Sequence, residues 1–308
     1  MFGVYIKALC RTAVPVFFMI SGFFYDQNSS HGRIVRQIKK ILGLFLVANV
    51  FYFFWNGFVA VCRGDELVAL LKSYVTPMSI IKLVIFHESP VEIHLWYLCA
   101  AAFSYIILLL IRKWGLFPLL YRGWPVLLVI NLLCGVYSTT ILGCQIPPTI
   151  ARSCYFTGVP FFMLGFWLHQ KQDWIRQRFT VGGLGICTAI FAALVVLEKY
   201  LLIRFAGDPE GDLYFSTIFL AVSIFLLFVS ARAPRRRLLR KLASVGQHDT
   251  VWIYIFHVAV INIVRLVPET TPIGMLLRLV FPVVILTVTL VLIALFKRLW
   301  RKIGYPHR

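Results

Sequence analysis

A few ionisable side chains lie inside stretches that are otherwise apolar, and these are the first candidates for chemistry. Arg11, Arg152 and His257 each lie within such a stretch, and His94 opens another. An ionised group in apolar surroundings costs free energy unless it has a partner or a ligand. A guanidinium group binds carboxylates and phosphates through paired hydrogen bonds, and an imidazole can act as a general base. We therefore treat these four residues as candidates for binding or catalysis.

Arg11 carries the strongest indication. It lies about ten residues into its apolar stretch, near the middle of a membrane at a rise of about 1.5 Å per residue. Pro15, four residues later, has no backbone N–H and frees a backbone carbonyl near Arg11. An anion-binding role and a structural role are both open. We favour anion binding, because burying an arginine without a site has a cost.

The two histidines each have a plain alternative. His94 is followed by Trp96 and Tyr97, a grouping typical of the membrane interface, where aromatic residues gather. The same position suits a general base or a hydrogen-bond partner of a substrate. His257 lies about one and a half turns inside its stretch. A hydrogen-bonded core histidine is the more common arrangement there, and we keep a role in the site as the second interpretation.

The chain as a whole is too apolar for a water-soluble protein. Of its 308 residues, 60% are hydrophobic and 14% are charged, against roughly 45–50% and about 25% in soluble domains. Since a span needs about 20 mostly apolar residues, we predict an all-α polytopic membrane protein in contact with the lipid bilayer. The expected transmembrane helices, about nine in number, are 2–25, 41–62, 94–111, 124–143, 150–168, 180–202, 213–230, 250–267 and 273–296.

Segment 63–93 is the longest connection on its side. It contains two apolar pieces separated by Pro77, and each piece is too short to span a membrane. We expect this segment to lie at the outer interface, as a lid or a re-entrant element.

Charges between the spans predict the orientation. The connections 26–40, 112–123, 169–179 and 231–249 and the tail 297–308 carry 21 Lys and Arg residues and 3 acidic residues. The opposite connections carry 6 Lys and Arg residues and 9 acidic residues. Since short cytoplasmic loops are enriched in Lys and Arg, we expect the first set, and with it the C-terminus, in the cytoplasm of a cell-membrane protein.

Composition and motifs also exclude several classes of function. The net charge of +19 does not predict nucleic-acid binding, because the basic residues sit in short loops between apolar segments. None of the seven cysteines forms a CxxC pair or a metal-ligand spacing. Glycine-rich phosphate loops and the common hydrolase motifs are absent. Any chemistry must therefore use residues in or near the membrane, with no bound metal.

Several motifs taken together resemble the acyltransferase 3 family of membrane acyltransferases. The most specific is Arg-Thr-Ala-Val-Pro-Val-Phe-Phe-Met-Ile-Ser-Gly-Phe, which begins at Arg11 and contains Ser21. The other matching residues, in the order that the family has them, are Arg33, Arg36, Lys39, Lys40, His94-Leu-Trp96-Tyr97-Leu, Pro160-Phe-Phe-Met-Leu-Gly165-Phe and Ile253-Tyr254-Ile-Phe-His257. The resemblance covers nearly the whole chain.

The resemblance implies a fold of ten helices and the transfer of an acyl group, typically acetyl, across the membrane. The implied donor substrate is cytoplasmic acyl-CoA, with no permanently bound cofactor. The implied acceptor is an extracytoplasmic glycan or another part of the cell envelope, so the reaction would be the O-acetylation of a polysaccharide. The residues expected to bind donor or substrate are Arg11, Ser21, Arg33, Arg36, Trp96, Arg152 and His257. His94 is the catalytic candidate.

The sequence departs from the family pattern at one point. The first helix of the family carries an arginine followed eleven residues later by a histidine thought to be catalytic, whereas Gly22 stands eleven residues after Arg11. An odd number of spans would also place Met1 outside. Both observations lead us to expect a further helix upstream of Met1. Two functions stay open: an O-acyltransferase acting on an extracytoplasmic glycan, and a non-catalytic transporter or binding module of the same family, for polysaccharide export or amino-acid uptake.

Cysteine labelling tests the orientation. In a background with the native cysteines replaced, a single cysteine at Asp208 should react with a membrane-impermeant maleimide added outside intact cells. A cysteine at Arg236 should react only after the membrane is opened, because it lies in the most basic connection. The reverse pattern would overturn the orientation.

Overall fold

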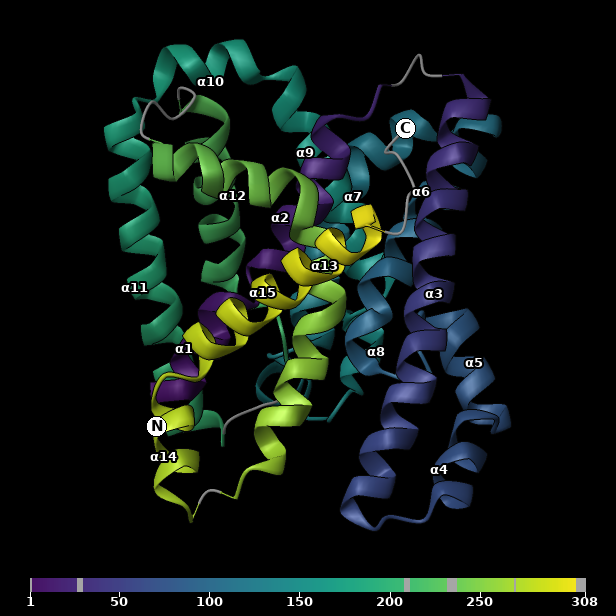
Figure 1. Ribbon diagram of the computed structural model, residues 1–308. Helices are drawn as coiled ribbons and strands as arrows, with labels where there is room; N and C mark the ends of the chain where they lie inside the picture. The colour runs from purple at the N-terminus through teal and green to yellow at the C-terminus, as the bar shows by residue number, and fades with distance from the viewer. Residues whose placement is uncertain (1, 27–29, 208–210, 232–236, 269, 303–308) are drawn as a thin grey trace. The chain divides into compact units, whose positions relative to one another are not determined.

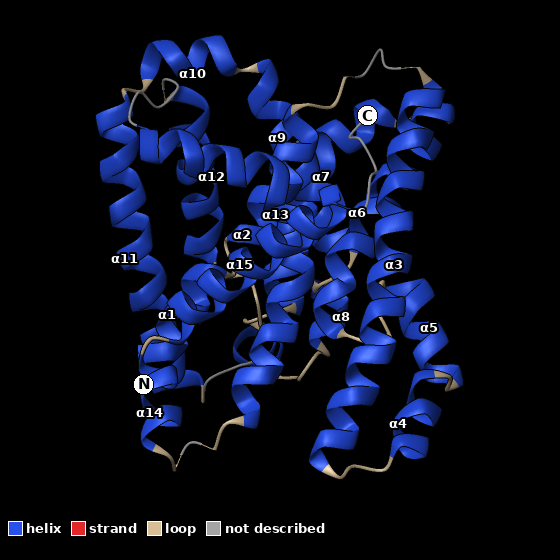
Figure 2. Ribbon diagram, in the orientation of Figure 1, coloured by secondary structure: helices blue, strands red, loops and turns tan. Residues whose placement is uncertain are grey.

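The computed structural model describes residues 2–26, 30–207, 211–231, 237–268 and 270–302. The described residues form helices joined by loops and turns, with no strand among them (Figure 2). The prediction of an all-α polytopic membrane protein is therefore confirmed. The chain divides into two compact units, which are described separately.

The first unit comprises residues 1–47 and 74–231. Its helices are α1 (Phe2–Cys10), α2 (Ala13–Phe23), the first half of α3 (His31–Arg63), α5 (Pro77–Phe86), α6 (Trp96–Lys113), α7 (Phe117–Cys134), α8 (Pro148–Ala151), α9 (Val159–Gln170), α10 (Gln172–Arg178), α11 (Val181–Ala206) and α12 (Phe215–Ser230) (Figure 1). A 3-10 turn at Ile93–Leu95 and π-helical turns at Ser138–Leu142 and Cys154–Gly158 complete it.

The second unit comprises residues 48–73 and 232–308. It contains the second half of α3, most of α4 (Leu67–Tyr74), α13 (Arg237–Leu266), α14 (Pro272–Leu279) and α15 (Phe281–Lys302). Val260 and Val264 of α13 pack against Ile285 of α15 to form its apolar core.

Seven spans of the described residues are long and apolar enough to cross a membrane: Gly3–Phe23, His31–Arg63, Ile93–Lys113, Phe117–Cys134, Val181–Ala206, Arg240–Leu266 and Phe281–Arg298. The pair α4 and α5, bent by 47° at a short break, meets the same condition when taken together. Pro77 begins α5, and the Thr76 side chain caps it by accepting from Ser79 N. The placement of this pair at the outer interface stays a prediction.

Three expected helices are interrupted where proline removes a backbone donor: 2–25 near Pro15, 150–168 near Pro160 and 273–296 near Pro282. The expected helix 150–168 is divided between α8, the turn Cys154–Gly158 and α9, since Pro160 cannot donate to the carbonyl of Phe156. The side-chain amide of the buried Asn131 in α7 donates to that carbonyl at 2.8 Å and to the carbonyl of Ala151 at 3.0 Å. A side chain thus replaces helical hydrogen bonds that membrane-buried backbone must otherwise make internally.

The expected helix 273–296 is interrupted in the same way. Pro282 stands at the second position of α15, and α14 has ended at Leu279. The expected helix 213–230 is uninterrupted and is present as α12, which has 16 residues.

Helices α2 and α9 make the closest helix packing of the first unit, and they carry similar motifs. Phe18 of α2 lies near Gly158, and Phe23 lies 4.8 Å from His169 between ring centroids, so the two helices run in the same direction. A Cβ atom on Gly22 would lie 1.8 Å from the carbonyl oxygen of Phe162. A Cβ atom on Gly165 would lie 2.0 Å from the carbonyl oxygen of Met19. Each glycine therefore admits the backbone of the other helix, as small residues do between membrane helices.

Alanine substitutions test this packing. Gly22→Ala and Gly165→Ala should each destabilise the protein by at least about 1–3 kcal/mol, because the helices must separate to admit the methyl group. Gly182→Ala is the matched control, since a Cβ there meets nothing within 4 Å and α11 continues through it. Thermal unfolding of the detergent-purified variants measures the difference. Equal stability of Gly22→Ala and Gly182→Ala would show that α2 and α9 do not approach this closely.

Candidate functional site

Arg11 lies at a break between two helices. Helix α1 ends at Cys10 and α2 begins at Ala13, while the Arg11 N–H still bonds to the Lys7 carbonyl at 3.2 Å. Pro15 has no N–H to donate to the Arg11 carbonyl, which explains the break at this point. The turn directs the Arg11 side chain toward the connection between α11 and α12, where its partners lie.

Two arginines share one carboxylate at this break. Arg11 Nε lies 3.1 Å from Asp212 Oδ1, and Arg152 Nη2 lies 3.2 Å from the same oxygen. A further bond joins Arg152 Nε to Asp212 Oδ2. The exposed fraction of the side chain is 19% for Arg11, 27% for Arg152 and 31% for Asp212. We call these three residues the outer cluster, after the side of the membrane on which the charge pattern predicts that they lie. Because it holds two cations and one anion, it keeps a net positive charge that can bind an anion or stabilise a developing oxyanion.

Tyr214 and Glu198 fix the segment that carries Asp212. Arg11 Nη1 donates to the hydroxyl of the buried Tyr214 at 3.4 Å, and the Lys199 ammonium lies 5.8 Å from the centre of the same ring. Glu198 accepts from the Phe215 N–H at 2.9 Å and from the Ser216 N–H at 2.8 Å. A carboxylate at a helix N-terminus is favoured by the free N–H groups and the helix dipole, so Glu198 anchors the start of α12.

Hydroxyl groups line the contact between α2 and α6. The Ser21 side chain lies beside Tyr97 and Tyr105 of α6. Its hydroxyl donates to the Phe17 carbonyl at 3.1 Å. Tyr25, just after α2, accepts from Arg112 Nη1 at 3.2 Å. We call these five residues — Ser21, Tyr25, Tyr97, Tyr105 and Arg112 — the hydroxyl seam. It runs from the start of α6 to its end, beside mostly apolar side chains.

The basic end of the hydroxyl seam opens into a small pocket. His31, Arg112 and Lys113 line a cavity of about 230 Å³ together with Leu109. Arg33, in the first turn of α3, lies 3.8 Å from Asp26, and both side chains are exposed. Arg36 is exposed on the next turn. Arg33 and Arg36 were expected from the sequence to hold a donor. The pocket adds three basic residues that the sequence did not single out, which are His31, Arg112 and Lys113.

His94 is paired with a carboxylate. Its Nδ1 lies 3.6 Å from Glu92 Oε1, and its side chain is only 15% exposed. The separation is longer than a hydrogen bond, so the carboxylate acts on the imidazole through its charge. An imidazole beside a carboxylate is a candidate general base. Trp96 is half-buried at the first position of α6.

His257 belongs to the second unit. Its Nδ1 is 2.7 Å from the Tyr254 carbonyl and 3.1 Å from the Ile253 carbonyl, both in the preceding turn of α13. Such bonds satisfy a core histidine locally. The structure thus brings Arg11 and Arg152 together, places Ser21 in the hydroxyl seam, and holds His257 by bonds within its own helix.

Another buried histidine was not singled out from the sequence. His87 follows α5 with φ 63°, the only positive φ at a non-glycine residue in the described part of the chain. Its Nε2 lies 3.5 Å from Cys154 Sγ, and its ring packs on Phe103 and Tyr155. Burial lowers the pKa of His87 from 6.5 to about 4, so the imidazole is neutral at neutral pH and acts as a packing element.

The residues that sequence reasoning missed lie in loops or look like ordinary aromatic residues. Asp212 and Glu92 were counted only as acidic charges between spans. Tyr97 was treated as part of an interfacial belt, and Tyr105 was not singled out. A tyrosine eight residues after another in one span was the available signal, because such a spacing places both rings near one face of a helix.

The chain was compared with known proteins. A family model described as an acyltransferase domain matches residues 1–298 of the 308. No curated protein and no solved structure matches the chain. The matched range includes the whole outer cluster, the hydroxyl seam and the pair of His94 with Glu92.

The outer cluster predicts a strong dependence on Asp212. Asp212→Asn keeps the shape but leaves Arg11 and Arg152 side by side without their shared carboxylate, so it should cost about 1–3 kcal/mol of stability. Asp26→Asn is the control, because its pair with Arg33 is exposed and 3.8 Å long and should contribute less than about 1 kcal/mol. Unfolding in detergent measures both. A double-mutant cycle of Asp212→Asn with Arg152→Gln that showed no coupling would contradict the cluster.

Proposed function

The chain belongs to the acyltransferase 3 family, and on this premise we propose that it moves an acyl group, expected to be acetyl, from cytoplasmic acyl-CoA to an extracytoplasmic glycan or another cell-envelope acceptor. Its helices and its family make it a multi-pass membrane protein and a membrane acyltransferase in general. The observation that supports the finer proposal is the hydroxyl seam, a row of polar side chains between the basic pocket and the end of the unit that holds the outer cluster.

The donor enters at the basic pocket. Arg112, Lys113 and His31 face one cavity, and Arg33 and Arg36 lie exposed on the start of α3. Their combined positive charge suits the phosphates of acyl-CoA, which arginine can bind with two parallel hydrogen bonds. From the charge pattern of the connections, we expect this end in the cytoplasm.

The donor reaches inward along the hydroxyl seam. Arg11 and Tyr25 are separated by 14 residues of mostly helical chain, which corresponds to about 21 Å. A thioester at the tip of a long, flexible donor must therefore pass between α2 and α6 to approach the outer cluster. Ser21, Tyr97 and Tyr105 offer hydrogen-bonding groups along that route, where the surrounding side chains are apolar.

Transfer takes place toward the opposite end of α2 and α6. Tyr97 packs on Phe17 and Phe18, so His94 and Arg11, which precede these residues in parallel helices, lie toward the same end. His94, oriented by Glu92, takes the proton of the acceptor hydroxyl as the oxygen attacks the thioester carbonyl. The cationic outer cluster stabilises the negative charge that develops on the carbonyl oxygen. The thiolate of CoA leaves as the new ester forms.

Two substitutions separate binding from transfer. His94→Gln should lower kcat by about 10²–10⁴-fold, as expected for loss of a general base, with little change in KM for acetyl-CoA. Arg112→Gln should raise that KM by about 10- to 150-fold, since one charge-assisted contact is worth roughly 1.5–3 kcal/mol. Exposed His248 provides the control His248→Gln, which should change neither.

The measurement is transfer of a radiolabelled acetyl group from acetyl-CoA to a purified cell-wall glycan, with the protein in proteoliposomes. Acetyl-CoA binding is measured in parallel by equilibrium dialysis. If the parent protein binds acetyl-CoA in a way that depends on Arg112 but transfers no acetyl group, the proposed enzyme activity is wrong. The alternative, a non-catalytic transporter or binding module, would then be favoured. Full transfer by His94→Gln would remove His94 from the chemistry.

A further inference from the structure

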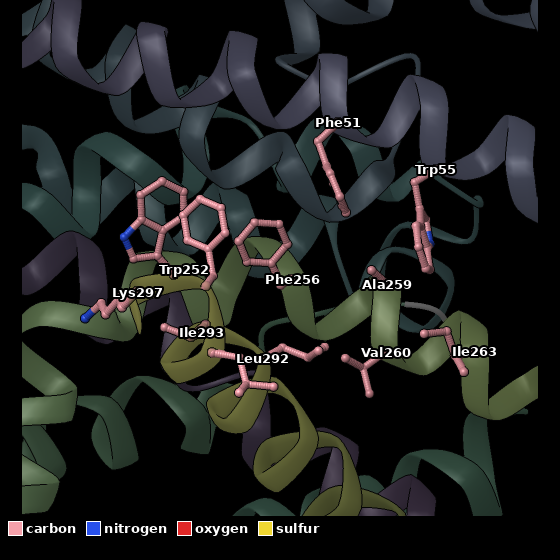
Figure 3. Close-up of a pocket in the computed structure, with 12 residues that line it drawn as sticks. Phe51, Trp55, Trp252, Phe256, Ala259, Val260, Ile263, Leu292, Ile293 and Lys297 are labelled. Carbon is pink, nitrogen blue, oxygen red and sulfur yellow. The ribbon is translucent and has the colours of Figure 1, made fainter. Parts of the chain in front are cut away.

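The second unit contains a large apolar groove that the proposed transfer reaction does not use. It encloses about 760 Å³ and is lined by side chains of α3, α13 and α15 (Figure 3). Ligand sites in proteins have volumes of roughly 300–1,000 Å³ and mostly apolar walls with a few polar groups. Here the only charged residue among the twelve described lining residues is Lys297.

The walls of this groove are held in place by a buried tyrosine. Tyr52 of α3 donates to the Ile255 carbonyl of α13 at 2.5 Å and accepts from the Ala259 N–H at 3.1 Å. This hydroxyl therefore joins the two helices at the level of the groove. Phe51, one residue earlier, packs edge-on against Phe256 at 5.0 Å between ring centroids. The groove is thus a preformed feature of packed helices.

The groove has the length of a single lipid chain. Its wall on α13 extends from Trp252 to Ile263 along one face of the helix, which corresponds to about 16 Å at 1.5 Å per residue. One leaflet of a bilayer contributes about half of a hydrocarbon core that is about 30 Å thick. An acyl chain lying parallel to α13 would fill the groove from the membrane interface to the bilayer centre.

The interfacial end of the groove carries one positive and one negative group. Lys297 Nζ is bonded to Asp249 Oδ1, and the two side chains are partly exposed. Trp252 lies at the same end (Figure 3), and tryptophan favours the level of lipid headgroups. A phosphoethanolamine headgroup carries the complementary charges: its phosphate matches Lys297 and its ammonium matches Asp249. A purely anionic headgroup would meet the Asp249 carboxylate and be disfavoured.

We propose that this groove binds one phosphatidylethanolamine molecule, with an acyl chain between α3, α13 and α15 and the headgroup at Lys297 and Asp249. The lipid would occupy a site of the second unit alone and does not depend on the proposed acyl transfer. Its predicted leaflet is the cytoplasmic one, because the basic connection 231–249 precedes Trp252.

Native mass spectrometry tests the site. The full chain is extracted from bilayers of equal parts dioleoyl phosphatidylethanolamine and dioleoyl phosphatidylglycerol, which have identical chains, and the lipid retained by each protein molecule is identified. We expect one retained lipid, with phosphatidylethanolamine favoured about tenfold. Leu292→Trp, which fills the groove, should lower retention about tenfold. Leu286→Trp is the matched control on α15, since Leu286 is outside the groove and similarly exposed, at 49% against 45%.

A charge variant tests the headgroup end. Asp249→Asn leaves Lys297 as the only charge of the pair, so the preference should shift toward the anionic phosphatidylglycerol. If this variant does not fold, Lys297→Gln serves instead and should lower retention of phosphatidylethanolamine. Equal retention of the two lipids by the parent, the absence of any retained lipid, or an equal loss in Leu286→Trp and Leu292→Trp would overturn the proposal.

Discussion

The shared carboxylate of Asp212 is the interaction on which the first unit depends most. Two guanidinium groups in an apolar unit would repel each other without it, and each would lose the free energy of its hydration. Asp212 forms ion pairs with both, and in doing so it ties the break between α1 and α2 to the turn after α8 and to the start of α12. Three interruptions of regular helix are thus held together by one ionic group. The membrane makes such internal pairing necessary.

The close contact of α2 with α9 complements this ionic group. Gly22 and Gly165 let the two backbones meet, which fixes the side of α2 that remains for α6. Ser21, the residue before Gly22, lies beside Tyr97 and Tyr105 of α6. One helix of eleven residues therefore makes a close apolar contact on one face and a polar contact on the other. The Ser-Gly pair of the motif has a physical reason, because each residue serves a different neighbour.

The fold class could be predicted from the sequence because composition and span length decide it, and the family could be predicted because its motifs are contiguous. The division of 150–168 into three pieces could not. The sequence shows that Pro160 cannot donate a hydrogen bond to the Phe156 carbonyl. The side chain that donates instead belongs to Asn131, 25 residues from Phe156 in the sequence. Likewise Asp212 was visible as a loop charge, but its contact with Arg152, 60 residues away, required the tertiary structure. Long-range polar partners carry no periodicity, so a sequence pattern cannot reveal them.

The geometry also bears on the role expected for Arg11. The sequence predicts an anion-binding role for this guanidinium near the middle of the membrane and leaves a structural role open. The structure pairs it with Asp212, beside Tyr214 and the start of α12, while Arg112, Lys113 and His31 gather at the other end of α2 and α6. Under the proposed function, a phosphate is better held at that basic end, where Lys113 is exposed and Arg112 is only half-buried, because an exposed cation has little cost of burial. The outer cluster, partly neutralised in advance, is better matched to the smaller negative charge of a carbonyl oxygen during transfer, because fixed and oriented donors stabilise developing charge without reorganising.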